Sequence, residues 1–266
     1  MAGFLAAFEP LALRLPAGLL LGTMVGSFLA TILIRWPQGE SALGGRSRCD
    51  SCGAALGPFA LVPIVSFLVM RGRCRSCGMR IDSRHLAIEL AAAGVGLAAF
   101  AAHALPLGLV TAVLGWWLLL IAALDLEHHW LPDRLTLPLI PLGLAAAWAG
   151  FGPPLAERVA GAAIGWAALA LIALAYVRLR GREGMGGGDP KLLGAIGAWL
   201  GAFQLPFVLL GAGLLGLAAV LSLRLRGETV TATTRLPLGT LMALAAWPLW
   251  LVAAADTFSL CPFLRC

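Results

Sequence analysis

The sequence predicts an all-α polytopic membrane protein with about eight transmembrane helices and a small extramembrane domain between the first two. The first observation is composition: the 266 residues are 60% hydrophobic and only 12% charged, whereas soluble domains average roughly 25% charged residues. The second is the presence of long apolar runs, since a helix needs roughly 20 such residues to cross a bilayer. The third is that these runs are continuous rather than alternating with a period of two, which favours helices over a closed barrel.

Eight hydrophobic segments follow one another along the chain. The segment 15–35 is too long for the apolar part of a signal peptide and no clear cleavage site follows it, so we expect a retained helix. The others are 86–104, 106–124, 134–151, 157–178, 190–204, 206–223 and 236–256. The organisation expected is therefore an N-terminal helix at 1–35, an extramembrane domain at 36–85, a seven-helix core at 86–256 and a tail at 257–266.

The arginines predict which loops face the cytoplasm, because basic residues are enriched in cytoplasmic loops. Residues 36–85 carry seven arginines, so we expect this domain in the cytoplasm and the N-terminus in the periplasm. Counting onward, the loops 125–133, 179–189 and 224–235 are also cytoplasmic, and the C-terminus is periplasmic. The net charge of +6 is explained by these loops, and we expect the bilayer, not nucleic acid, as a partner.

Four cysteines in the 36–85 domain form two Cys-x2-Cys pairs. Cys49 and Cys52 are separated by 21 residues from Cys74 and Cys77, a pattern typical of tetrahedral zinc. A cytoplasmic location argues against stable disulfides here. We therefore expect a small cytoplasmic domain with a structural zinc, whose four-thiolate shell leaves no open position for catalysis. Cys261 and Cys266 lie in the periplasmic tail, where a disulfide between them is an open alternative.

Two carboxylates are predicted at the same membrane face. Asp125 ends the third helix in "IAALDLEHHWLPDRLTLP", and Asp189 opens the sixth after "GMGGG". Acidic residues that border hydrocarbon usually face the interior of a helix bundle and usually have a function. Neighbouring aspartates share one proton, so one can activate water while the other donates to a scissile carbonyl. The alternative is that both are helix-end residues that reach water.

The residues around these aspartates are assigned as follows. The glycines of 184–188 are expected to allow close backbone approach and positive φ, and no phosphate-binding loop motif is present. Asp133 is interpreted as the N-cap of the fourth helix. Glu127, His128 and His129 are interpreted as solvated loop residues, because no HExxH pattern supports a metal site.

Three stretches resemble motifs of the type IV prepilin peptidases. "GMGGGDPKLLGAIGAWLG" resembles their GxGD motif, "ALDLEHHWLPDRLTLP" their first aspartate motif, and "GSFLATILIRWP" their N-terminal signature. The resemblance extends over nearly the whole chain. It implies a bifunctional enzyme of the bacterial inner membrane, which cuts a leader peptide after glycine and N-methylates the new N-terminus with S-adenosylmethionine. It also implies a tetracysteine domain, which many members of the family carry.

Carried over residue by residue, the resemblance makes Asp125 and Asp189 the catalytic pair. The residues it places in the loop that supports the second aspartate are Gly186, Gly187, Gly188 and Lys191. The residues it links to methyl transfer or substrate binding are Gly26, Ser27, Phe28, Arg35, Pro37 and Glu89. Ala30, Trp36 and His85 depart from the usual asparagine, leucine and tyrosine, and all three departures concern methyl transfer. Glu89 has an alternative interpretation as a partly buried partner of Arg84.

Three hypotheses for function follow. The leading one is an aspartyl endopeptidase that acts on prepilins or pseudopilins, with Glu127 and Asp133 meeting the basic leader. The alternative is a transporter or channel that uses Asp125 and Asp189 for protons or cations; both acids lying on one side, with no inverted repeat, argue against it. The third is a scaffold that has lost activity, which the intact aspartate pair disfavours.

Overall fold

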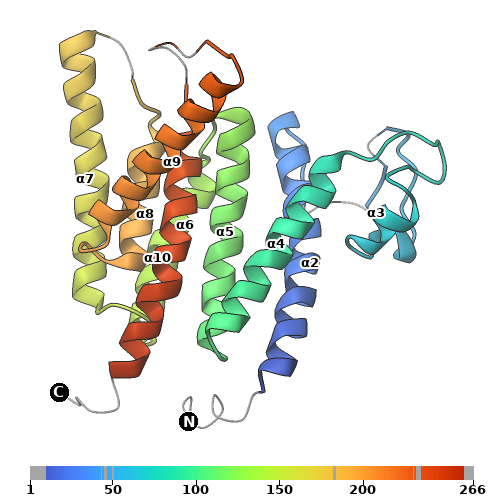
Figure 1. The fold of residues 1–266 in the computed structure, drawn as a ribbon, viewed down its shortest axis with the longest axis horizontal. Coiled ribbons are helices and arrows are strands. Elements are labelled where there is room, and N and C mark those ends of the chain that lie inside the picture. Colours follow the sequence, from blue (N-terminus) through green and yellow to red (C-terminus); the bar gives the residue numbers. More distant parts are fainter. Residues whose placement is uncertain are drawn as a thin grey trace. The chain divides into compact units, whose positions relative to one another are not determined.

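The computed structural model describes residues 10–42, 44, 47–49, 51–181, 184–229, 231 and 235–260. The all-α prediction is confirmed for this part of the chain, which contains two isolated β-bridges but no named strand. Cys261 and Cys266, on which the disulfide alternative depends, lie outside the described residues. The helices are α2 (Leu11–Arg35), η1 (Trp36–Gln38), η2 (Pro58–Leu61), α3 (Val65–Val69), α4 (Ser83–Ala102), α5 (Leu107–His128), α6 (Asp133–Trp148), α7 (Leu155–Arg180), α8 (Gly188–Leu200), α9 (Leu205–Leu225) and α10 (Leu238–Leu260) (Figure 1).

The chain forms two compact units, Met1–Leu120 and Ile121–Cys266, whose boundary falls inside α5. In the first unit, α2 and α4 pack as an antiparallel pair. Glycines at every fourth position of α2 allow this close contact: a Cβ on Gly18 would lie 2.5 Å from the carbonyl oxygen of Gly96, and one on Gly22 would lie 2.5 Å from that of Ala92. Such small-residue spacing lets membrane helices approach backbone to backbone. A loop lobe containing the cysteines separates the two helices in the sequence.

In the second unit, α8 is the central helix. Asp189, Pro190 and every residue from Leu192 to Leu200 are buried, and α6, α7 and α10 all contact α8. Glycines again set the spacing, since a Cβ on Gly197 would lie 2.2 Å from the carbonyl oxygen of Gly161 on α7. A helix that is apolar all round is expected to be surrounded by protein or lipid. Here it is surrounded by other helices.

A buried arginine near the N-terminus of α7 connects several helices of the second unit. Arg158 is 0% exposed and donates to the carbonyl oxygens of Pro153 at 3.0 Å, Gly143 at 2.7 Å and Phe151. Its guanidinium also lies 5.2 Å from the ring centroid of Trp250 on α10. A buried charge is tolerated when its donors are satisfied in this way. Arg158 therefore links α6, α7 and α10.

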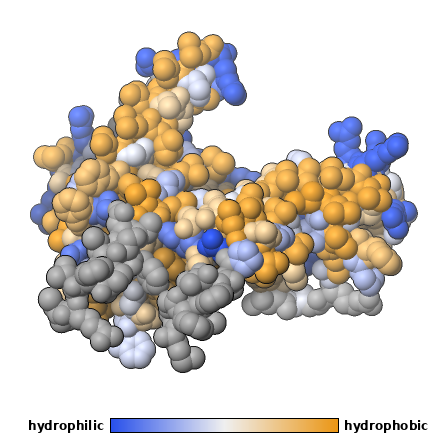
Figure 2. Space-filling view, turned by 60° about the horizontal axis from the view of Figure 1, so that its bottom comes forward, coloured by the Kyte–Doolittle hydropathy of each residue, from blue (hydrophilic) through white to orange (hydrophobic). Residues whose placement is uncertain are grey.

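Five helices are long and apolar enough to cross a membrane: α2, α4, α5, α7 and α9. The other three predicted spans are helical but shorter. α6 has 16 residues and α8 has 13, and the described apolar part of α10 runs from Leu238 to Ala254. The count of eight spans therefore stays a prediction. Many large apolar side chains lie on the surface, including Leu20, Met24, Phe203 and Leu217, and Figure 2 shows hydrophobic residues over much of the visible face.

Candidate functional site

Asp125 lies near the end of α5 and is held by the first turn of α10. The side chain is buried at 5% exposure. Its Oδ2 accepts a hydrogen bond from the backbone N–H of Thr240 at 2.8 Å. The Thr240 hydroxyl donates to the carbonyl oxygen of Ala122 at 2.8 Å and lies 3.3 Å from the same Oδ2. The carboxylate is thus fixed through Oδ2 by one residue that lies 115 positions away in the sequence.

Asp189 lies in the first turn of α8 and is also buried, at 7% exposure. Its Oδ2 accepts the backbone N–H of Gly186 at 3.1 Å. The expectation of positive φ in this glycine run is wrong, because none of Gly184, Gly186, Gly187 or Gly188 has one. Close approach is the reason for glycine at two of these positions: a Cβ on Gly188 would lie 2.5 Å from the Cβ of Leu131, and one on Gly184 would meet the ring of Tyr176.

Leu131 lies between the two aspartate segments. Its Cβ packs against Gly188, the residue before Asp189, and its methyl groups pack against Gly239, the residue before Thr240. A Cβ on Gly239 would lie 2.8 Å from Leu131 Cδ2 and 3.0 Å from Asp125 Oδ2. Leu131 therefore contacts both segments that carry the carboxylates. The second unit thus brings together two buried acids that lie 64 positions apart in the sequence, Asp125 and Asp189.

Lys191 joins this site to the start of α6. Its Nζ donates to Asp133 Oδ1 at 2.6 Å and Oδ2 at 2.9 Å. The interpretation of Asp133 as the N-cap of α6 is wrong, because Pro132 occupies that position and no side chain caps the helix. Asp133 lies in the first turn, where a carboxylate also favours the helix dipole. Glu127, His128 and His129 are exposed, as predicted.

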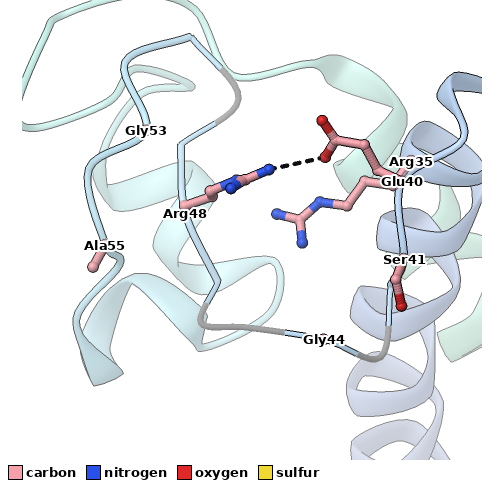
Figure 3. A pocket seen from close by; sticks show the side chains of 7 residues that line it. All are labelled: Arg35, Glu40, Ser41, Gly44, Arg48, Gly53 and Ala55. Atoms are coloured by element: carbon pink, nitrogen blue, oxygen red, sulfur yellow. Dashed lines mark hydrogen bonds and ion pairs between the residues drawn. The ribbon is translucent and has the colours of Figure 1, made fainter.

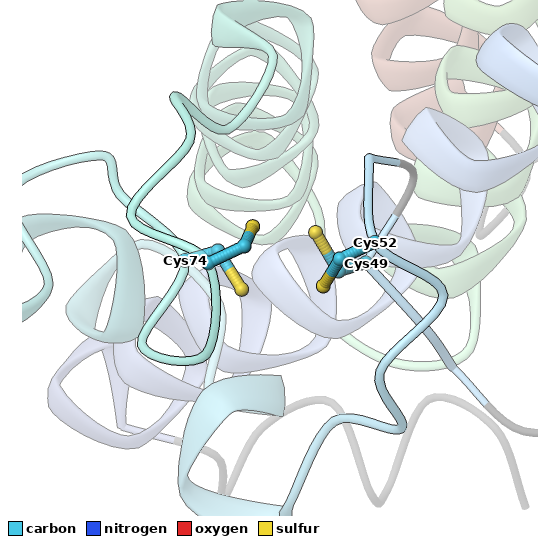
Figure 4. A group of neighbouring side chains, drawn as sticks. Cys49, Cys52 and Cys74 are labelled. Atoms are coloured by element: carbon cyan, nitrogen blue, oxygen red, sulfur yellow. The ribbon is translucent and has the colours of Figure 1, made fainter.

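The four cysteines converge on one point in the first unit. Their Sγ atoms all lie within 4.8 Å of one another, and Figure 4 shows the sulfurs of two loops turned toward each other. The loops are alike: Gly53 and Gly78 have φ of +70° and +72° and donate to the carbonyl oxygens of Cys49 and Cys74. The thiolate is the form of cysteine that binds metal. This donor set fits tetrahedral zinc.

The residues of the N-terminal signature divide into two groups. Gly26 packs on Glu89, where an added Cβ would lie 2.7 Å from the Glu89 Cα. The buried Glu89 accepts the backbone N–H of Ile64 at 2.7 Å. Arg84 forms an ion pair with Asp82, and the alternative interpretation of Glu89 as a partner of Arg84 stays a prediction. Ser27 and Phe28 lie on the same helix, α2, and Phe28 is 44% exposed.

Arg35 ends α2 and, with Glu40 and Arg48, lines a hollow of about 510 Å³ between that helix end and the first cysteine loop. Pro37 lies next to it in η1. Figure 3 shows the Arg35 guanidinium directed toward the Arg48–Glu40 pair, whose ion-pair distance is 3.0 Å.

The fold and the site define a polytopic helical protein with a paired-aspartate site and a tetracysteine lobe. Residues 20–103 match the model of the bacterial peptidase A24 N-terminal domain, and residues 112–221 match that of the type IV leader peptidase family. The chain therefore belongs to the type IV leader peptidase family, a family of proteases, and is a multi-pass inner-membrane enzyme. No solved structure matches the chain.

Relatives named prepilin leader peptidase/N-methyltransferase match over most of their length. That of Dichelobacter nodosus is 36% identical over 91% of this chain and 94% of its own. That of Burkholderia pseudomallei strain 1026b is 38% identical over 85% of this chain and 82% of its own. That of Pseudomonas aeruginosa is 35% identical over 91% of each chain. The resemblance drawn from the motifs is thereby confirmed.

Sequence reasoning missed Thr240 and Gly239. Both belong to "LPLGT" at 236–240, directly before and inside the first turn of α10. The available signal was a Gly-Thr pair at a helix start in an apolar chain, where threonine is a common capping residue. Nothing in that signal points to Asp125.

Proposed function

We propose that this protein is an aspartyl endopeptidase that cleaves the leader of type IV prepilins or pseudopilins after glycine, and that it N-methylates the new N-terminus. The observation that carries the peptidase half is the burial of Asp125 and Asp189 in two segments that meet at Leu131. Two carboxylates in such a site share a proton. The names of the relatives support the same two activities.

The two acids divide the chemistry of hydrolysis between them. The ionised aspartate takes a proton from a water molecule as its oxygen attacks the scissile carbonyl carbon, and the protonated aspartate donates to the carbonyl oxygen. Collapse of the tetrahedral intermediate breaks the C–N bond, and the amine leaves with a proton from the carboxyl pair. No covalent enzyme intermediate forms. Asp125 is held by Thr240, and Asp189 by Gly186, so both are oriented before substrate arrives.

The proposed site faces the cytoplasm, with both chain termini in the periplasm. Support comes from the exposed arginines of the tetracysteine lobe and of the α9 end, since basic loops favour the cytoplasmic side. Among the residues proposed to meet the basic leader, Asp133 is bound to Lys191, and the exposed Glu127 lies 3.7 Å from His128 Nε2. Replacing both, by Glu127→Gln and Asp133→Asn, is expected to raise KM for basic leaders; an unchanged KM contradicts this role.

The four cysteines are proposed to hold a structural zinc. Cys49 and Cys52 come from one loop and Cys74 and Cys77 from the other, so a bound ion cross-links the lobe and adds binding energy to its folding. A shell of four thiolates leaves no open position, and the metal takes no part in hydrolysis. The expected stoichiometry is one zinc per chain, lost in Cys74→Ser.

The methyl donor is proposed to bind in the first unit. The signature residues Gly26, Arg35 and Glu89 lie there, whereas both aspartates lie in the second. The hollow that Arg35 and Arg48 line lies in the same unit, and S-adenosylmethionine supplies the methyl group when bound. The two activities are therefore expected to be separable by mutation.

Mass spectrometry of a prepilin incubated with membranes that contain this protein and S-adenosylmethionine tests both halves. The expected products are the free leader and a mature chain that carries one added methyl group. Cleavage without methylation would contradict the second activity alone and would direct attention to Ala30 and His85. Failure to cut several pilin-type substrates would contradict the proposed function and favour the transporter alternative.

A further inference from the structure

The tetracysteine lobe has an exposed apolar surface that neither zinc binding nor catalysis explains. It is formed by η2 and α3, and we call it the apolar ridge. Its most exposed members are Phe59 at 84%, Val69 at 67% and Leu68 at 62%. The ridge also includes Leu61, Val62 and Val65. A lobe surrounded by water rarely exposes a contiguous group of large apolar side chains, so such a group usually marks a contact with lipid or protein.

A hydrogen bond fixes the level of the ridge along the neighbouring helix. The backbone N–H of Ile64, between η2 and α3, donates to the buried Glu89 at 2.7 Å. Glu89 lies six positions after Ser83, the first residue of α4, which is roughly 9 Å along a helix. Because α4 is a candidate membrane span, the ridge lies beside a span rather than beyond its end.

The partner helix gives the same level. Gly26 of α2 packs on the Cα of Glu89, and α2 continues for nine further residues, to Arg35. Figure 1 likewise shows α3 beside α2 and α4. Both apolar helices thus continue beyond the level of the ridge. This puts the ridge at the depth of the membrane interface and not in bulk water.

The chain directly after the ridge is basic. Arg71, Arg73 and Arg75 are all exposed, and none of them forms an ion pair with an acidic side chain in the described part of the chain. An apolar surface bordered by arginines is the pattern of a segment that lies in the membrane interface. Basic side chains next to a bilayer bind anionic headgroups.

We propose that the apolar ridge, residues 58–69, inserts into the membrane leaflet next to the tetracysteine lobe, with Arg71, Arg73 and Arg75 on the phosphates of anionic lipids. The occupant of this surface is lipid, and not a second copy of the chain or a substrate helix. The ridge holds the lobe against the bilayer, while Glu89 holds the ridge against α4. This inference needs only a membrane-embedded chain and does not depend on the proposed catalytic activity.

Photo-crosslinking of the full chain in nanodiscs of phosphatidylethanolamine and phosphatidylglycerol tests the proposal. Benzoylphenylalanine is placed at Phe59 or Leu68, and, as a matched control, at Ser51, which is exposed on the first cysteine loop of the same lobe. The expected result is phospholipid adducts at the two ridge positions and several-fold fewer at the control. Arg71→Gln, Arg73→Gln and Arg75→Gln together are expected to lower the phosphatidylglycerol share of those adducts.

Two results would overturn the proposal. Lipid adducts at Phe59 and Leu68 no more abundant than at Ser51 would place the ridge in water. Adducts to an added prepilin that replace the lipid adducts would make the ridge a substrate surface. Substitution of Phe59 gives a second measurement, with benzoylphenylalanine at position 68 as the probe. Phe59→Trp keeps an apolar side chain, so the yield of lipid adducts should equal that of the parent. Phe59→Asp should reduce that yield several-fold.

Discussion

At the level of single residues, proteolysis by this site depends on how Asp125 is oriented. Thr240 holds it with a backbone N–H, and its hydroxyl is anchored on Ala122. Thr240 does not contact a substrate in this account, so it is a positioning residue. Its loss should therefore affect the turnover of bound substrate and not the binding of the leader, since misplacement of a reacting group lowers the rate of the chemical step.

Thr240→Val keeps the shape of the side chain and removes the hydroxyl. We expect kcat for leader cleavage to fall by about fivefold, as the loss of one hydrogen bond of roughly 1 kcal/mol would give, with KM unchanged. Thr240→Ser should restore the rate. The measurement is steady-state kinetics with a prepilin, and methylation of a pre-cleaved pilin by the same preparation shows that the chain is folded. A rise in KM at constant kcat would contradict the positioning role.

Gly239→Ala tests the orientation of Asp125 by adding a side chain next to it. The added Cβ would lie 3.0 Å from Asp125 Oδ2 and 2.8 Å from Leu131 Cδ2, so one of the two must move. A displacement of that kind can cost on the order of 100-fold in rate. Gly213→Ala is the matched control, because nothing lies within 4 Å of a Cβ on Gly213. Equal cleavage rates for the two variants would show that Asp125 is not held as described.

At the scale of elements, helix packing depends on glycine at the contact. A Cβ on Gly96 would lie 2.1 Å from the Gly18 carbonyl oxygen, whereas one on Gly94, in the same helix, would meet nothing within 4 Å. Gly96→Ala should therefore destabilise the α2–α4 pair by about 1–3 kcal/mol through overpacking. Gly94→Ala should be neutral or stabilising, because alanine favours a helix. Thermal unfolding in detergent compares them, and equal melting temperatures would contradict the contact.

The start of α4 predicts a pH dependence. Asp82 accepts the N–H of Arg84 at 2.9 Å, and the Arg84 side chain lowers the pKa of Asp82 below its ordinary value. A lowered folded-state pKa gives stability that is present above the unfolded pKa of about 3.9 and is lost as pH falls through the folded value. The stability difference between the parent and Asp82→Asn should thus be constant near neutrality and shrink below about pH 4. A difference that grows on acidification would contradict this assignment.

Elements and site were predictable to different extents, for physical reasons. The long helices follow from continuous apolar runs, and the cysteine site from local spacing, because both depend on residues close in the sequence. Thr240 and the Lys191–Asp133 pair were not predictable, since each contact joins segments 58 or more positions apart. Asp133 illustrates the limit: a carboxylate beside a helix start favours the N-cap interpretation, whereas tertiary packing pairs it with Lys191.

At the scale of the whole molecule, the arginine distribution predicts the topology. The turn at 149–154, between α6 and α7, should be periplasmic, and residues 226–229, after α9, should be cytoplasmic. Reporter fusions at these two positions, active only in the periplasm or only in the cytoplasm, measure this directly. Opposite outcomes at the two sites are expected. The same outcome at both would mean that α7, α8 and α9 do not cross as three successive spans.

The central claim is that two buried aspartates cut the leader peptide. The most direct measurement is mass spectrometry of a prepilin after incubation with the parent chain, Asp125→Asn and Asp189→Asn, each in the presence of S-adenosylmethionine. The account predicts cleavage by the parent and none by either variant, while both variants still methylate a pre-cleaved pilin. Leader cleavage that persists in either aspartate variant would contradict the account.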